Sequence, residues 1–141
     1  MHLVQFFFNN RRPTLRDRTK LKSFIKSIFL QEKKEIIKLS YIFCSDKQLL
    51  NINKVFLNHD FYTDIITFNL SQTLKQIDGE VYISVDRVKY NAKVFGVSYT
   101  EELHRVMFHG ALHLCGYGDK KRAEILQMRL KEDECIKIYF K

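Results

Sequence analysis

The chain has 141 residues, of which 45% are hydrophobic and 28% are charged, and these proportions exclude a disordered chain. With 24 lysines and arginines against 16 aspartates and glutamates, its net charge of +8 favours an acidic partner such as nucleic acid. The length predicts a single domain over residues 1–141, large enough to bury a core without disulfides.

The N-terminal half predicts two strands and two helices. Residues 2–8 are mostly apolar and indicate a buried strand, and residues 35–44 alternate in the manner of a second one. Between them, residues 17–30 have apolar side chains at helical spacing, separated by lysines and arginines. Asp46 is expected to cap the next helix. The apolar positions of that helix are Leu49, Leu50, Val55 and Phe56.

Two further strands are expected at residues 64–70 and 79–85. The polar stretch between them ends at Asp78-Gly79, a pair of residues that favours a turn. We therefore expect a hairpin with an irregular loop.

The C-terminal part predicts three helices. Asp86 is expected to cap the first of them, which ends near Gly96. Thr100 opens the next, which breaks at residues 116–118, and the last covers residues 120–137. The inner side of the last helix is expected to hold Ala123, Leu126, Leu130 and Cys135. Four strands and about five helices that do not strictly alternate predict an α+β fold, with the helices packed on a small, mostly four-stranded sheet.

Nothing in the sequence indicates a membrane span or an exported protein. The apolar run near the N-terminus is too short to cross a bilayer and has neither a basic leader nor a cleavage site. Three scattered cysteines form no disulfide framework and are typical of a reducing compartment. We expect a soluble, cytoplasmic protein.

The main chemical signal is the stretch HGALHLCGYGD at residues 109–119. His109 and His113 stand four residues apart on a predicted helix, so both imidazoles share one face and can reach one metal ion. Glycines after the helix allow the chain to reverse and return the carboxylate of Asp119. Two nitrogens, one oxygen and an open position are typical of a catalytic zinc site on a helix and the following turn.

Other interpretations of this stretch stay open. Two histidines on an apolar helix face are also compatible with core packing, and the same donor set resembles the facial triad of non-haem iron. Cys115 lies beside the motif but on another side of the helix, as does His104, which we interpret as a surface residue or partial cap. Gly110 stands where HExxH zinc proteases carry their catalytic glutamate, which argues against proteolysis.

The motif resembles the signature of the YbeY family of metal-dependent endoribonucleases, in which three histidines hold zinc. The resemblance continues upstream in TDIITF at residues 63–68 and DGEVYIS at residues 78–84, and in Asn91-Ala92 and Glu102-Leu103. It implies a single-strand-specific endoribonuclease that acts in ribosomal RNA processing and maturation and in ribosome quality control. It also implies one zinc ion per chain, with ribosomal RNA and the ribosome or small-subunit proteins as partners.

Two positions depart from the family pattern. Asp119 stands where the commonest form of the family has its third histidine, although a carboxylate is also a legitimate zinc ligand. Leu57 stands where family members often carry an arginine thought to act on the RNA. Either another cation, such as Lys54 or Arg87, takes this role, or the role has moved to a partner.

The mechanism that we expect is hydrolysis of a phosphodiester by metal-activated water, with basic side chains holding the flanking phosphates. No spacing singles out a general base. The acidic candidates are Glu80, Asp86 and Glu124. Phe61, Tyr62 and Tyr117 are candidates for stacking on bases, although packing within the protein is the more usual role of aromatics. The basic helix at residues 16–34 is a candidate contact for RNA or ribosome.

Three classes of function remain: a metal-dependent endoribonuclease, another zinc hydrolase, and a non-catalytic ribosome-associated RNA-binding protein with a structural metal. Loss of RNA cleavage with retained RNA affinity, on substitution of His113, separates the first class from the third.

Overall fold

One mixed sheet of four strands organises the fold in this computed structural model, which describes residues 3–141. The strands are β1 (Val4–Phe8), β2 (Glu35–Cys44), β3 (Ile65–Asn69) and β4 (Gln76–Ser84). Their order in the sheet is β1-β2-β4-β3. β2 pairs in parallel with β1 and with β4, whereas β3 pairs antiparallel with β4. The expected α+β class with a four-stranded sheet is confirmed, and residue 2 of the first expected strand lies outside the described residues.

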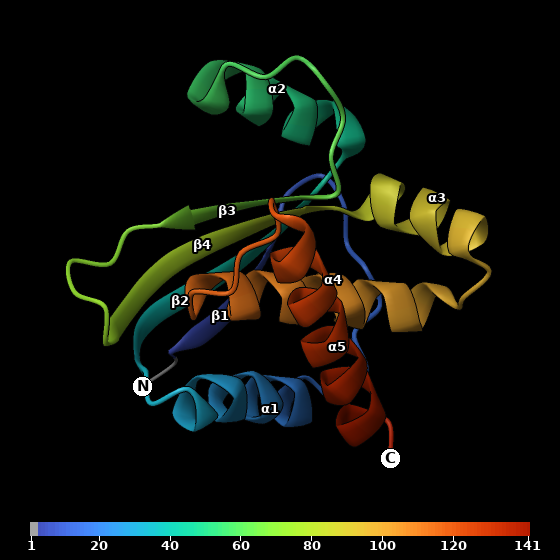
Figure 1. Ribbon diagram of the computed structural model, residues 1–141. Coiled ribbons are helices and arrows are strands. Elements are labelled where there is room, and N and C mark those ends of the chain that lie inside the picture. Colours follow the sequence, from blue (N-terminus) through green and yellow to red (C-terminus); the bar gives the residue numbers. More distant parts are fainter. Residues whose placement is uncertain (1–2) are drawn as a thin grey trace.

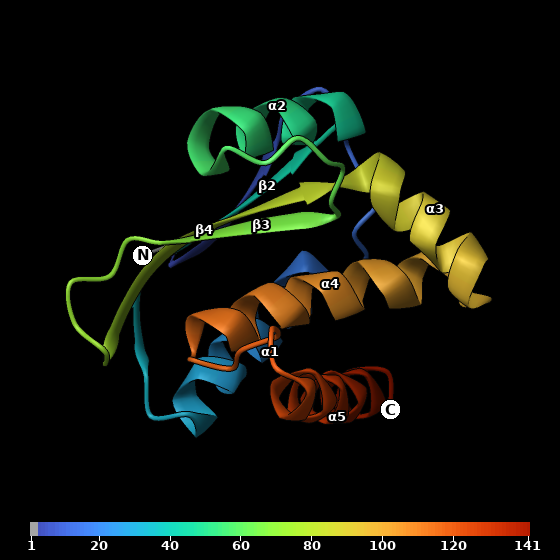
Figure 2. The ribbon, with the colours of Figure 1, turned by 45° about the horizontal axis from the view of Figure 1, so that its top comes forward.

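Helices cover both faces of this sheet (Figure 1, Figure 2). In the described residues they are α1 (Arg18–Gln31), α2 (Asp46–Leu57), α3 (Val85–Phe95), α4 (Tyr99–Leu114) and α5 (Arg122–Tyr139). α2 lies on one face, α4 crosses the other face with α1 beside it, and α5 packs on the outer side of α4. No helix within residues 3–141 is long and apolar enough to cross a membrane.

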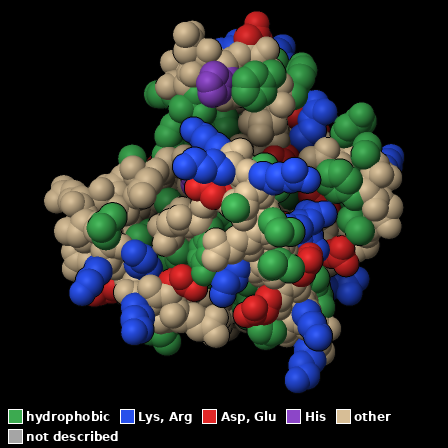
Figure 3. Space-filling model, viewed as in Figure 1, with side chains coloured by type: hydrophobic (Ala, Val, Ile, Leu, Met, Phe, Trp, Pro, Cys, Tyr) green, Lys and Arg blue, Asp and Glu red, His purple; other side chains and the backbone are tan. Residues whose placement is uncertain are grey.

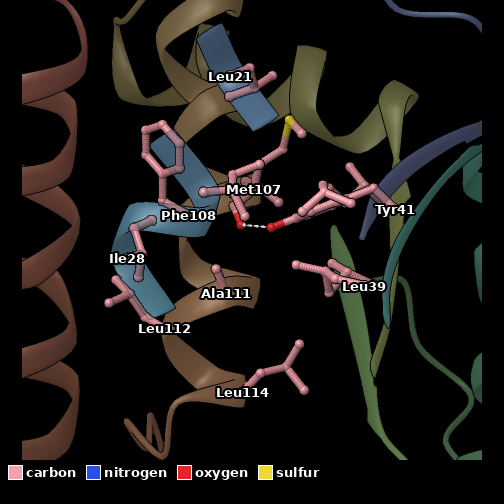
Figure 4. Packing of buried hydrophobic residues seen from close by; sticks show 14 of the residues in the cluster. Leu21, Ile28, Leu39, Tyr41, Met107, Phe108, Ala111, Leu112 and Leu114 are labelled. Carbon is pink, nitrogen blue, oxygen red and sulfur yellow. Dashed lines mark hydrogen bonds between the residues drawn. The ribbon is translucent and has the colours of Figure 1, made fainter. Parts of the chain in front are cut away.

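The main core lies between the sheet and α4 (Figure 4). Leu103, Met107 and Phe108 of α4 are fully buried, as expected for its apolar stripe. Met107 faces Tyr41 of β2, whereas the ring of Phe108 lies on the opposite side of α4, against Phe24 of α1 and Tyr139 of α5. The Tyr41 hydroxyl donates a hydrogen bond of 2.8 Å to the backbone carbonyl of Met107. This bond satisfies a buried phenol and fixes α4 against the centre of the sheet.

Two glycines mark the points where α4 comes closest to the sheet. A Cβ atom at Gly110 would stand 2.8 Å from Cγ1 of Val81 and 3.1 Å from Cδ1 of Ile65. A Cβ atom at Gly79 would stand 2.8 Å from Cδ1 of Leu114. Packing therefore explains the glycine that stands at the position of the protease glutamate.

The β3–β4 hairpin differs from the sequence expectation. Gly79 and Asp78 lie inside β4, which begins at Gln76, and not in the turn. The pairing continues because the backbone N–H of Leu70 donates to the carbonyl of Asp78, and that of Asp78 donates to Ser71 Oγ. Gly79 thus makes room for α4 and forms no turn.

Serine caps three helices, where the sequence suggested neighbouring residues. Ser45, Ser84 and Ser98 precede α2, α3 and α4, and each hydroxyl accepts from the backbone N–H three residues later. Asp46 and Asp86, the expected caps, lie in the first turns instead. Their negative charges there interact favourably with the positive end of the helix dipole. The expected end of α3 at Gly96 is confirmed, with φ at +69°.

The expected inner faces of α2 and α5 are partly wrong. In α2, Leu49 is buried, but Val55 and Phe56 are 66% and 68% exposed, and Phe56 touches the sheet only through an edge contact with Phe68 of β3. In α5, Ala123, Leu126 and Leu130 are exposed, and of the expected residues only Cys135 is buried. The face of α5 that contacts α4 consists of Met128, Glu132, Cys135 and Tyr139.

Replacement of Gly110 by alanine should lower the free energy of unfolding by about 1–3 kcal/mol, because its methyl group would overlap Val81. Urea unfolding followed by circular dichroism measures this change. A cycle with Val81→Ala provides the control: the double variant should lose less than the two single losses together, since removal of Cγ1 opens the space. Wild-type stability of Gly110→Ala would contradict the close approach.

Candidate functional site

α4 and the turn that follows it bring the expected ligands to one side of the molecule. The rings of His109 and His113, one helical turn apart, have centroids 6.5 Å apart and planes within 5° of parallel. After α4 the chain reverses at Gly116, whose φ of +110° favours glycine. Asp119 then approaches α4, with its Oδ2 3.3 Å from Nε2 of His109.

The Nδ1 atom of each histidine forms a hydrogen bond with an acceptor of the protein. His109 Nδ1 donates to Oε2 of Glu132 at 2.6 Å, and His113 Nδ1 donates to the backbone carbonyl of Tyr117 at 3.1 Å. Because a carboxylate and a carbonyl only accept, the lone pair of each neutral ring lies on Nε2. Histidines that bind metals are commonly oriented by such partners.

Two imidazole nitrogens and one carboxylate oxygen are chemically suitable zinc ligands, and the distance between His109 and Asp119 is also suitable. Nitrogen and oxygen ligands at about 2.0–2.2 Å from zinc, separated by a tetrahedral angle, lie about 3.4 Å apart. The His109–Asp119 distance of 3.3 Å is close to that value. The two histidine rings lie 6.5 Å apart between centroids, and within residues 3–141 no three His, Cys, Asp or Glu side chains are gathered closely enough to surround one ion. The side chains of His109, His113 and Asp119 would have to move closer together to complete such a site.

A buried carboxylate organises the charges behind His109. Glu132 is 5% exposed, and its Oε1 accepts from Arg105 at 3.2 Å and from Arg129 at 3.5 Å. Burial disfavours the charged form of His109, but the hydrogen bond and charge of Glu132, together with the charge of Asp119, outweigh this effect and raise the pKa of His109. Protons therefore compete for His109 with any metal, so metal affinity should fall as the pH is lowered.

A cavity of about 490 Å³ opens beside His109 and Asp119. Its polar wall includes Asp64 and Glu102, and Glu102 is only 4% exposed. Burial, reinforced by the charge of Asp64, raises the pKa of Glu102 from 4.5 to about 7. Burial also raises the pKa of Asp64.

A second groove of about 230 Å³ lies on the other side of His109 and also contains His113. Its walls include Phe61 from the loop after α2, and Lys120 from the turn before α5. Figure 3 shows lysine and arginine side chains gathered where this loop and the start of α5 meet. His109 and Asp119 therefore lie between two cavities, one of them near exposed basic residues.

Comparison with known proteins identifies the family. The family model described as Endoribonuclease YbeY matches residues 7–139. The chain belongs to the YbeY endoribonuclease family. A Cytophaga hutchinsonii protein named Endoribonuclease YbeY is 46% identical over 135 residues, which cover 96% of this chain and 94% of the relative. A relative of the same name from Flavobacterium psychrophilum is 47% identical over 125 residues, which cover 89% of each chain.

The fold is also that of a solved structure. The solution structure of TM1509 from Thermotoga maritima matches with a TM-score of 0.68 at 23% sequence identity, covering 97% of this chain and 89% of that chain. At this identity the likeness concerns the fold alone.

The cations suggested in place of the family arginine are both paired elsewhere. Lys54 lies 3.3 Å from Asp60, and Arg87 forms an ion pair of 2.7 Å with Asp46. Neither lines the two cavities, although Leu57, at the arginine position, lines the groove. The cation that the groove does contain is Lys120, which sequence reasoning did not single out.

None of the acidic candidates for a general base lines either cavity, although Glu124 accepts from the backbone N–H of Lys120 beside the groove. Glu80 pairs across the sheet with Phe68, on the opposite face from Val81 and α4. Glu124 caps α5 by accepting from the backbone N–H of Lys121. Asp86 accepts from Arg11.

His104, His59 and Cys115 lie outside the ligand set. His104 is 3% exposed, so the expectation of a surface residue was wrong: its ring packs against Tyr139, and its Nδ1 lies 2.7 Å from the Thr100 carbonyl. His59 lies in the loop after α2 and stacks on Phe61. Burial raises the pKa of Cys115 to about 12, which keeps its thiol protonated.

The aromatic candidates differ in their exposure. Phe61 and Tyr62 are 56% and 52% exposed, so they are accessible for stacking, and Phe61 lines the groove. Tyr117 instead donates a hydrogen bond to Glu32, which ties the turn after α4 to the end of α1.

Sequence reasoning missed Glu132, the partner of His109. Its signal was present, because Glu132 falls at helical spacing from Met128 and Cys135 on the buried face of α5. A charged residue on a buried helix face indicates a specific partner. The expectation that Leu126 and Leu130 form the inner face of α5 placed Glu132 on the wrong side of the helix.

The raised pKa of Glu102 predicts a pH-dependent stability. The unfolded carboxyl ionises near pH 4.5 and the folded one near 7, so this group destabilises the fold progressively as the pH rises between these values. Relative to wild type, Glu102→Gln should therefore gain about 3 kcal/mol of unfolding free energy between pH 4.5 and pH 8. Denaturant unfolding of chelator-treated protein measures the gain. Glu101→Gln, the same change outside the cavity, is the control; an equal gain in both variants would contradict the assignment.

Proposed function

We propose that the chain is a zinc-dependent, single-strand-specific endoribonuclease in which His109, His113 and Asp119 hold the metal. The observation that carries the proposal is the orientation of the two histidines, whose Nδ1 atoms are engaged by Glu132 and by the Tyr117 carbonyl. This arrangement leaves the Nε2 lone pair of each ring free to bind a metal, and the Asp119 carboxylate lies 3.3 Å from Nε2 of His109. Membership of the YbeY endoribonuclease family supports the reaction class.

The same family membership supports the biological setting of the proposal. We infer that the substrate is ribosomal RNA and that the enzyme acts in its processing and maturation and in ribosome quality control, in contact with the ribosome or small-subunit proteins.

The protein contributes orientation and charge to this chemistry. A zinc ion at this site supplies Lewis-acid polarisation of a phosphate oxygen and acidifies water. Glu132 keeps the His109 ring in position and its proton on Nδ1, and Arg105 and Arg129 offset the charge of the buried Glu132. Burial of this network limits the movement of His109, which favours a preorganised site.

Basic residues next to Asp119 are suited to bind the RNA backbone. Lys120, Lys121 and Arg122 follow Asp119 directly and are exposed. Lysines and arginines on phosphates position a strand without reading its sequence. The exposed ring of Phe61, across the groove from this segment, is available to stack on an unpaired base.

Elemental analysis of purified protein tests the ligand set. Wild-type protein should contain close to one zinc per chain, whereas His109→Ala and Asp119→Ala should lose it. Asp119→His should retain zinc, because it restores the commonest third ligand of the family. Glu134→Gln, an exposed change near Glu132, is the control. Zinc retained in both alanine variants, or absent from wild type purified without chelators, would contradict the site.

Cleavage assays then separate the enzyme from a binding protein. His113→Ala, with its fold verified by circular dichroism, should lose cleavage of single-stranded RNA by at least about a hundredfold while retaining most of its RNA affinity. Cleavage by metal-free protein or by His113→Ala at the wild-type rate would contradict the metal mechanism. RNA binding without cleavage by metal-loaded wild type would favour the non-catalytic alternative.

Removal of the Lys120 side chain should weaken the binding of all single-stranded RNA sequences by a similar factor. Each lost phosphate contact lowers the slope of log affinity against log salt by about 0.7 for a single strand. Lys120→Ala should therefore show a smaller slope and a lower affinity at low salt, measured by fluorescence anisotropy. Lys137→Ala, an exposed lysine near the far end of α5, should leave the slope unchanged. Equal slopes for Lys120→Ala and wild type would exclude a phosphate contact at Lys120.

A further inference from the structure

The cavity between α3, α4, α5 and the start of β3 has the character of a binding pocket. Its volume of about 490 Å³ lies within the range of roughly 300–1,000 Å³ that is usual for small-ligand sites. Apolar side chains form much of its wall, and a few polar groups converge on it. The apolar members are Ile65, Phe95, Val106, Ile125 and Met128.

Glu102 is the polar group of this cavity that lacks a protein partner. Its side chain lines the cavity and is 4% exposed, and within residues 3–141 its carboxyl forms neither a hydrogen bond nor an ion pair. Its oxygens are not sealed off by the surrounding protein, so they remain reachable from the cavity. The neighbouring polar groups are engaged: Asp64 accepts from Asn91 at 3.4 Å, and Arg105 pairs with Glu132 and Asp133. A buried carboxyl without a partner is costly, and its cost falls when a ligand supplies donors.

We propose that this cavity binds an unstacked guanine base, with the Glu102 carboxylate accepting hydrogen bonds from the guanine N1–H and N2 amino groups. The proposal deepens the function proposed above and rests on it for the link to cleavage. It assigns a base preference to the nuclease: a guanosine next to the bond that is cut.

The pattern of donors selects guanine. A carboxylate has only acceptors, so it pairs best with two adjacent donors. The guanine edge offers N1–H and the N2 amino group side by side, whereas adenine and cytosine place a ring acceptor next to their single amino group. The apolar walls suit the faces of a flat base, as in other sites that receive an unstacked base.

The position of the pocket suits a nucleotide that spans it and the proposed metal site. Glu102 and His109 lie seven residues apart on α4, which is two helical turns, or about 10 Å along one face. His109 and Asp119 line the same cavity as Glu102. A nucleotide whose base is held at Glu102 can therefore reach His109 with its sugar and phosphate.

Binding of free nucleotides tests the pocket without any cleavage. Chelator-treated protein is titrated with guanosine, inosine and adenosine monophosphates and followed by NMR chemical shifts or calorimetry. Guanosine monophosphate should bind about tenfold or more tightly than the other two, since inosine lacks the N2 amino group and adenine lacks both donors. Glu102→Gln should lose this preference, and Glu101→Gln should keep it. Equal binding of the three nucleotides, no detectable binding at millimolar nucleotide, or an unchanged preference in Glu102→Gln would overturn the proposal.

Cleavage mapping then distinguishes this proposal from the proposed function. Single-stranded RNAs that differ only by guanosine, inosine or adenosine beside the cut should be cleaved fastest with guanosine. Guanine binding without any RNA cleavage would reject the nuclease function and keep the pocket. Cleavage without preference for guanosine would reject the pocket and keep the nuclease.

Discussion

The hydrogen bond of 2.6 Å between His109 Nδ1 and Glu132 Oε2 joins α4 to α5 at the centre of the site. The carboxylate of Glu132 is almost completely buried, and a buried charge is stable only when several hydrogen-bond or ion-pair partners surround it. Arg105 from α4 and Arg129 from α5 supply them, together with His109. The same contacts that hold α5 on α4 thus also orient the imidazole, so stability and site geometry depend on one network.

This network needs α4 to be held in place, and the sheet provides that support. Tyr41 fixes the middle of α4 through the Met107 carbonyl, and Gly110 allows the next turn to approach Val81 closely. The histidines lie on the turns next to these contacts. Because the helix is held against a close-packed core, the positions of His109 and His113 are defined by packing as well as by their own hydrogen bonds.

His109 and Asp119 divide the surface into two regions with different chemistry. On one side lies the larger cavity, with the half-buried carboxyl of Asp64 and the buried carboxyl of Glu102. On the other side lies the groove with Lys120 and the exposed ring of Phe61. A single strand of nucleic acid has both kinds of group, flat bases and charged phosphates, and the two regions match them separately.

Periodicity and local chemistry by themselves determined the class of fold, the four strands, the five helices and the shared face of His109 and His113. These features depend on residues close in sequence, where hydrophobic spacing and glycine turns act directly. The resemblance of residues 109–119 to a known signature supplied the family, which the comparisons confirm. Only the tertiary structure decided that Glu132 faces His109, that Glu80 lies on the far face of the sheet, and that Val55 and Leu126 face solvent. These facts depend on which elements pack together. Spacing along the chain can mark Glu132 as a residue of a buried helix face, but it does not show which segment that face meets.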